Sequence, residues 1–157
     1  MTRRSLIALA ALGSGAMLLA AFGFQYLGGL APCAMCLWQR WPHAAALAIG
    51  ALGLALPHAA IAALGALSMG INAGIALLHT GVERGWWTLN LSCTGGSEDL
   101  GAMSMADLLN PEIGSGIVMC DEVAWQMFGL SMASWNGIAC LALAGLWIAA
   151  ARARSAQ

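Results

Sequence analysis

The sequence predicts an all-α membrane protein, a bundle of four transmembrane helices with a long, mostly irregular outer loop between the third and fourth helices. Two observations predict this class. Only 8% of the 157 residues are charged and 61% are hydrophobic, whereas about 25% of residues are charged in ordinary soluble domains. The charges also fall in blocks, so that residues 5–39, 41–82 and 123–151 carry none. A soluble domain of this length cannot bury so much apolar surface.

Four membrane spans are expected, because a helix that crosses a bilayer needs about 20 apolar residues. Pro57 divides the long uncharged run, since proline ends a helix and biases the preceding residue away from the α conformation. The whole chain, residues 1–157, therefore reads as one membrane domain. Its spans are expected at about 6–25, 41–57, 60–79 and 133–151, and its outer loops at about 26–40 and 80–132.

The arginines predict the orientation. Two of them precede the first span and two follow the last, whereas only Arg40 and Arg84 fall on the opposite side. Basic flanks favour the cytoplasm, so both termini are expected there. A cleaved signal peptide is the alternative for the basic and apolar N-terminus, but its apolar run of about 19 residues is longer than a usual signal core. We therefore expect a membrane anchor.

Four of the five cysteines fall on the outer side in this topology, where disulfides persist. They are Cys33, Cys36, Cys93 and Cys120, and four cysteines allow three pairings. Cys33 and Cys36 form a C-x-x-C motif and are the natural local pair. Cys93 and Cys120 lie in the acidic, glycine-containing loop, whose composition favours exposure but leaves open a pair tucked against the membrane. They form either a structural staple or an exchangeable bridge that a partner's thiolate opens.

A single arginine follows the C-x-x-C motif. A helix that begins near Pro32 puts Cys36 and Arg40 one turn apart on the same face. The helix N-terminus and the guanidinium would both lower the pKa of the Cys36 thiol. Arg40 is therefore expected to stabilise a negative charge, carried by a thiolate or by a reduced electron acceptor. The alternative is an interfacial arginine that reaches the lipid headgroups.

His79 stands at the outer end of the third span, on the same side as Cys36 and Arg40. An ionisable residue at membrane depth is a candidate for function, although a structural hydrogen bond is the commoner role of a single histidine. His43 and His58 read as helix-end residues. The cysteine spacing is not that of a structural zinc site, and the motif lacks the histidine of haem attachment. We assign no metal ligands.

Several motifs together resemble the DsbB family, the quinone reductases of the bacterial inner membrane that reoxidise DsbA. They are "CAMCLWQR" after the first span, "HTGVE" at the end of the third, the two loop cysteines, and "CDEVAWQMFGLSMASWNG" before the fourth. The resemblance extends over nearly the whole chain. Gln39 stands where some relatives have an acid, so no acid–base role is expected there. Cys140 lies outside the family's redox set and reads as a small apolar packing residue.

The resemblance implies an electron route. A periplasmic thioredoxin-fold protein of the DsbA type would attack the Cys93–Cys120 bridge at Cys93. The released Cys120 would then exchange with Cys33. Cys36 would become a thiolate facing ubiquinone or menaquinone, with Arg40 and His79 beside the quinone.

This reading implies that the cysteines act on the periplasmic side of the inner membrane. Its partners are the DsbA-like protein, membrane lipid and quinone, and no nucleic acid. Two alternatives remain open: a non-enzymatic membrane scaffold whose disulfides staple the outer loops, and a metal-handling membrane protein.

Overall fold

The computed structural model describes residues 1–87 and 119–153. Within them, four helices account for nearly all the regular structure, and one short hairpin precedes the last helix. The helices are α1 (Arg3–Tyr26), α2 (Ala34–Ala55), α3 (Ala59–Glu83) and α7 (Met132–Arg152), and the strands are β1 (Gln126–Met127) and β2 (Leu130–Ser131). The predicted fold class, an all-α bundle with a long connection between the third and fourth of these helices, is confirmed.

Each helix begins at a residue whose side chain accepts a hydrogen bond from a backbone N–H of the first turn. Such caps satisfy donors that have no partner inside the helix. Pro57 lies between α2 and α3, as expected, and His58 is the cap of α3. The four caps are Thr2, Cys33, His58 and Ser131.

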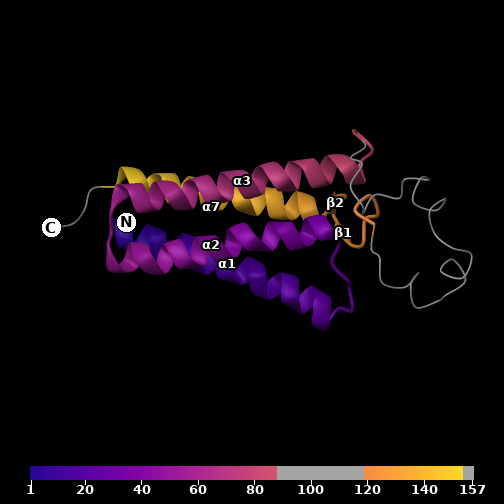
Figure 1. Cartoon of the computed structure of the whole chain (residues 1–157), viewed down its shortest axis with the longest axis horizontal. Coiled ribbons are helices and arrows are strands. Elements are labelled where there is room, and N and C mark those ends of the chain that lie inside the picture. Colours follow the sequence, from indigo (N-terminus) through magenta and orange to yellow (C-terminus); the bar gives the residue numbers. More distant parts are fainter. Residues whose placement is uncertain (88–118, 154–157) are drawn as a thin grey trace, which may run out of the picture.

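The four helices lie side by side along the long axis of the molecule (Figure 1). Helix α3 packs along α7 and α2, and α1 packs against α2 and α7. The N-terminus, the end of α7 and the α2–α3 turn are at one end of the bundle, and the α1–α2 connection and the hairpin are at the other (Figure 1). Phe128 and Gly129 turn the hairpin, both with positive φ (53° and 76°), as a two-residue turn of this kind requires.

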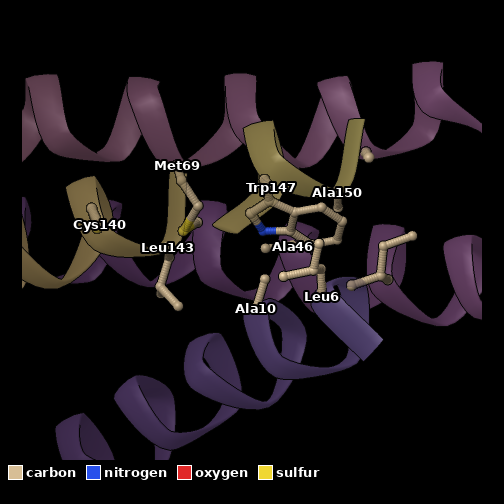
Figure 2. Close-up of a cluster of buried hydrophobic side chains, with 10 residues drawn as sticks. Leu6, Ala10, Ala46, Met69, Cys140, Leu143, Trp147 and Ala150 are labelled. Atoms are coloured by element: carbon tan, nitrogen blue, oxygen red, sulfur yellow. The ribbon is translucent and has the colours of Figure 1, made fainter. Parts of the chain in front are cut away.

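The centre of the bundle is packed around Trp147, which is fully buried (Figure 2). Gly65 of α3 makes room for the indole, because a Cβ there would lie 2.3 Å from Trp147 Cδ2. Cys140 is also fully buried and belongs to the same apolar cluster, together with Met69 and Ala46 (Figure 2). Its predicted role as a packing residue is confirmed.

Three helices, α1, α3 and α7, are long and apolar enough to cross a membrane, and the chain is a membrane protein. Helix α2 is 22 residues long, but polar residues in its first half lower its hydropathy. It begins at Ala34, which confirms the helix expected near Pro32, although the span itself was expected only from residue 41. The crossing of α2 and the orientation of the bundle stay predictions.

Candidate functional site

The C-x-x-C motif forms the beginning of α2. Cys33 is the cap, and its Sγ accepts a hydrogen bond from the Cys36 backbone N–H at 3.2 Å. Both residues are thiols in this structure, and their sulfur atoms lie 3.1 Å apart, with Cys33 donating to Cys36. Cys33 is buried and Cys36 is half-buried. The pair is therefore held inside the end of the bundle, with Cys36 as the more accessible sulfur.

The pKa values of the two thiols are shifted in opposite directions. The pKa of Cys33 is raised to about 12, first because its hydrogen bond to Cys36 holds the proton and then because it is buried. Cys36 lies in the first turn of α2, ahead of the expected span. Its pKa is lowered, first by the hydrogen bond from Cys33, and burial opposes this. The direction agrees with the sequence-based expectation, but the main cause is Cys33 and not Arg40.

His79 and Glu83 reach the cysteines from the last turns of α3. His79 is buried, and its Nε2 lies 3.5 Å from Cys33 Sγ and 3.8 Å from Glu83 Oε1. The structure thus brings His79 to the C-x-x-C motif, although to Cys33 rather than to Cys36. Glu83 was not singled out in the sequence, and its Oε2 is buried with no hydrogen-bond partner among the described residues.

Arg40 lies one turn after Cys36 but is held by α1. Its Nη1 donates to Gln25 Oε1 at 2.7 Å, and its guanidinium carbon lies 4.9 Å from the centre of the Phe22 ring. Its Nε is buried and has no hydrogen-bond partner in the described part of the chain. The Nε of Arg40 is therefore an unused donor, while the Gln25 amide and the Phe22 ring stabilise the positive charge.

Cys120 is fully buried and packs in a small cluster with Cys33, Met35 and Val82, next to Cys36. The sequence favoured an exposed loop cysteine and left a tucked one open, and for Cys120 the structure shows the tucked placement. The segment before the hairpin returns to the end of the bundle, where Cys120 packs against the cluster and Met119, Glu122, Ala124 and Trp125 line a cavity. Cys93 lies outside the described residues.

These side chains surround one cavity of about 280 Å³ between α1, α2, α3, α7 and the segment before the hairpin. Most of its wall is apolar, with Phe24 and Trp135 among the aromatic contributors. The polar side of the wall includes Cys36, Gln39, Arg40 and His79. A mostly apolar cavity with a few convergent polar groups is the usual form of a small-molecule site.

Comparison with known proteins shows to which family this chain belongs. The sequence profile described as "Disulfide bond formation protein DsbB" matches residues 3–150. The chain belongs to the DsbB family. It is 35% identical over 143 residues to Disulfide bond formation protein B of Methylococcus capsulatus, covering 82% of this chain and 81% of that one. It is 32% identical over 160 residues to the protein of the same name of Verminephrobacter eiseniae, covering 99% and 89%. No solved structure matches the chain significantly.

Membership of the DsbB family fits the chemistry of the site. The family is described by disulfide bond formation, and such a role needs sulfur atoms that can exchange with one another. Three of the four predicted redox cysteines, Cys33, Cys36 and Cys120, lie together at one end of the bundle. Arg40 and His79 line the same cavity as Cys36. Their roles stay predictions.

The sequence analysis missed the buried amides beside this site. Gln39 Nε2 lies 2.9 Å from His79 Nδ1, and Asn136 Nδ2 donates to Gln39 Oε1 at 2.7 Å. His43 is also buried, and its Nε2 lies 3.0 Å from Asn136 Oδ1, so its reading as a helix-end residue is wrong. A signal was present, because Cys36, Gln39, Arg40 and His43 recur at the spacing of one helix face. A polar stripe on a membrane helix points inward.

The same geometry could hold a metal ion. The donor atoms of Cys33, Cys36 and His79 all lie within 4.8 Å of one another. Two thiolates and an imidazole suit a soft metal such as zinc or Cu(I). The sequence analysis considered only the cysteines as ligands and did not combine them with His79.

The reduced protein is expected to react with an alkylating reagent at Cys36 before Cys33. Alkylation requires the thiolate. A lowered pKa keeps Cys36 charged as the pH falls, whereas the pKa of Cys33, about 12, keeps that thiol protonated across the neutral range. Between about pH 9 and about pH 7 the Cys36 rate should therefore fall less than that of an ordinary cysteine. Peptide mass spectrometry after timed iodoacetamide treatment measures both rates, and faster labelling of Cys33 at neutral pH would contradict this assignment.

Proposed function

We propose that this DsbB-family chain is a protein-dithiol oxidase that reoxidises a periplasmic thioredoxin-fold protein of the DsbA type and passes two electrons to membrane quinone. The electrons would pass through Cys93 and Cys120 and then through Cys33 and Cys36. One observation carries the proposal: Cys120 is buried against Cys33, and Cys36 lines the cavity that Arg40 and His79 also line.

The exchange steps balance without an added oxidant. The partner's thiolate attacks Cys93 in the Cys93–Cys120 disulfide, and Cys120 leaves as a thiolate. Cys120 attacks Cys33 in the Cys33–Cys36 disulfide, and Cys36 leaves as a thiolate. In each step one S–S bond forms and one breaks. The partner's second thiolate then releases the partner in its oxidised form and frees Cys93.

The next step restores the loop bridge. Cys93 attacks Cys120 in the Cys33–Cys120 disulfide, which re-forms Cys93–Cys120 and leaves Cys33 and Cys36 as a dithiol. Oxidation of this dithiol gives up two electrons and two protons. The hydrogen bond from Cys33 to Cys36 supports the assignment of Cys36 as the charged sulfur of this pair.

The cavity fits a quinone headgroup. Its apolar wall suits the ring, and the unpartnered Nε of Arg40 offers a buried donor for a carbonyl oxygen. Cys36, Arg40 and His79 are the residues expected to contact the headgroup, as the family resemblance implies. Ubiquinone or menaquinone, when bound, supplies the acceptor for two electrons and two protons.

The proposed location is the bacterial inner membrane, with four spans, both termini in the cytoplasm and the redox cysteines on the periplasmic side. The arginine distribution supports this orientation. A second support is that the N-terminus and the end of α7 lie at the end of the bundle opposite to the hairpin (Figure 1).

The test is quinone reduction by the purified protein, supplied with a reduced thioredoxin-fold donor and followed by the absorbance of the quinone. Wild type is expected to turn over with a ubiquinone or a menaquinone analogue, and Cys93→Ser is expected to lose donor-dependent turnover. A wild type that turns over with neither analogue would refute the proposal and favour a scaffold stapled by disulfides. Stoichiometric zinc or copper in the purified protein would instead favour metal handling.

A further inference from the structure

A line of buried polar side chains leads from the middle of the bundle to the cysteines. His43 and Gln39 come from α2, Asn136 from α7 and His79 from α3. None of the four is more than 9% exposed. Successive polar atoms lie 3.0 Å (His43 Nε2 to Asn136 Oδ1), 2.7 Å (Asn136 Nδ2 to Gln39 Oε1) and 2.9 Å (Gln39 Nε2 to His79 Nδ1) apart. The line continues to Cys33 Sγ at 3.5 Å from His79 Nε2.

His43, at the end of this line farthest from the cysteines, fixes the donor-to-acceptor direction of its hydrogen bonds. His43 Nδ1 is buried and has no hydrogen-bond partner among the described residues. A buried N–H without a partner is rare and costly, whereas a bare imidazole nitrogen has no proton to satisfy. The proton of His43 therefore belongs on Nε2, which donates to Asn136 Oδ1. The thiol of Cys140 lies 3.7 Å from His43 Nε2 and donates to Asn136 Oδ1 at 3.9 Å, so it does not need His43 Nε2 as an acceptor.

The side-chain amides of Asn136 and Gln39 continue the same donor-to-acceptor direction toward His79. Because Asn136 Oδ1 accepts, its Nδ2 is the donor to Gln39 Oε1. Because Gln39 Oε1 accepts, its Nε2 is the donor to His79 Nδ1. A neutral imidazole that accepts at one nitrogen carries its proton on the other. His79 is thereby the Nε2–H tautomer.

The near end agrees with this assignment. Two acceptors lie before His79 Nε2: Cys33 Sγ at 3.5 Å and Glu83 Oε1 at 3.8 Å. The opposite direction would turn a bare Nε2 toward the Glu83 carboxylate. It would also leave an N–H of His43 buried without a partner. Both ends of the line therefore favour the same direction.

We propose that His43, Asn136 and Gln39 are positioning residues that fix His79 as a donor to Cys33, so that the Cys33 thiol hydrogen turns to Cys36 and the charge of the reduced pair lies on Cys36. Every hydrogen bond in the chain then has the same direction, and bonds aligned in this way strengthen one another. The tautomer does not depend on the proposed function. Only the use of the Cys36 thiolate in electron transfer rests on it.

The test reads the tautomer directly. The full chain contains three histidines, so ¹⁵N-histidine labelling of the reduced protein in detergent gives few signals. His58→Gln and His79→Gln assign them, each by the signal that disappears. Wild type is expected to show His79 with its proton on Nε2, and a proton on Nδ1 would overturn the proposal. This readout needs no turnover, so a protein inactive with quinone but with the expected tautomer refutes the proposed function alone.

Two variants test whether Asn136 and Gln39 determine the tautomer of His79. Asn136→Leu removes the donor that orients Gln39, and His79 is expected to lose its single tautomer. The titration midpoint of the Cys36 thiolate, followed by ultraviolet absorbance, should then rise by about 0.5–1 pH unit, the equivalent of one lost hydrogen bond. Gln39→Glu puts an acceptor beside His79 Nδ1 and is expected to move the proton to that nitrogen. An unchanged tautomer in both variants would overturn the proposal.

Asn72→Leu is the matched control for Asn136→Leu. Asn72 is fully buried, and its Nδ2 donates to the backbone carbonyl of Gln39 at 3.0 Å, not to the Gln39 side chain. The same substitution there should leave the tautomer of His79 and the Cys36 titration unchanged. If Asn72→Leu changes both as Asn136→Leu does, the effect is general loosening of the bundle, and the positioning role is refuted.

Discussion

Replacing Cys36 with serine is expected to reduce quinone-dependent oxidation of the dithiol partner to the uncatalysed background, a loss of at least about 10³-fold. Cys33 and Cys36 both line the cavity that Arg40 lines, and Cys36 is the sulfur that accepts the hydrogen bond from Cys33 and the more accessible of the two. Without it, electrons that reach Cys33 have no exit. Donor-dependent absorbance change of a quinone analogue measures the loss.

The same variant is expected to trap an intermediate disulfide. With no Cys36, the Cys33 thiolate cannot return to its usual partner and can attack Cys120 in the Cys93–Cys120 disulfide, from which Cys93 leaves as a thiolate. Cys33 and Cys120 already pack together, which favours their bond over the loop bridge. Peptide mapping without reduction should therefore find Cys33 joined to Cys120 in Cys36→Ser, with Cys93 as a thiol. Cys140→Ala is the control, because that thiol is buried in the core cluster and should leave turnover within about twofold of wild type. Turnover retained by Cys36→Ser would remove Cys36 from the route.

The fold could be predicted from the sequence because its main determinants are long-range averages. Uncharged runs and a dividing proline identify helices whatever their exact contacts. A helix that begins near Pro32 was expected from the C-x-x-C motif and the arginine after it, and α2 begins at Ala34. The start of the second span was placed too late, at residue 41, because polar residues such as Gln39 and Arg40 are typical of a loop until they are seen to face a cavity.

The site could be predicted only in part. Cys36, Arg40 and His79 were recognised because their residue types suggest thiolate chemistry at a membrane surface. The supporting amides were not, because Gln39 and Asn136 come from different helices and nothing in the sequence shows that they meet. The burial of Cys120 depends on how residues after the long loop return to the bundle, which local composition does not determine.

Replacing Arg40 with glutamine is expected to raise the KM for a quinone analogue by about 10- to 100-fold, the effect of losing one charge-assisted hydrogen bond. The unpartnered Arg40 Nε is a buried donor on the cavity wall, while Nη1 and the ring of Phe22 hold the guanidinium in place. Arg40→Lys keeps the charge but not the planar donor, and it should show an intermediate rise. Steady-state rates at varied quinone concentration measure both variants.

Arg84→Gln is the matched control, because it removes the other arginine at this end of the bundle. Arg84 is exposed, donates to the Gly129 carbonyl at 3.0 Å and lies over the Trp86 ring, away from the cavity wall. A general effect of positive charge on quinone or lipid would act through both arginines, whereas a specific donor acts through Arg40 alone. If Arg40→Gln keeps the wild-type KM while its thermal stability falls, Arg40 serves only to join α2 to Gln25 and Phe22 of α1, and the quinone site lies elsewhere.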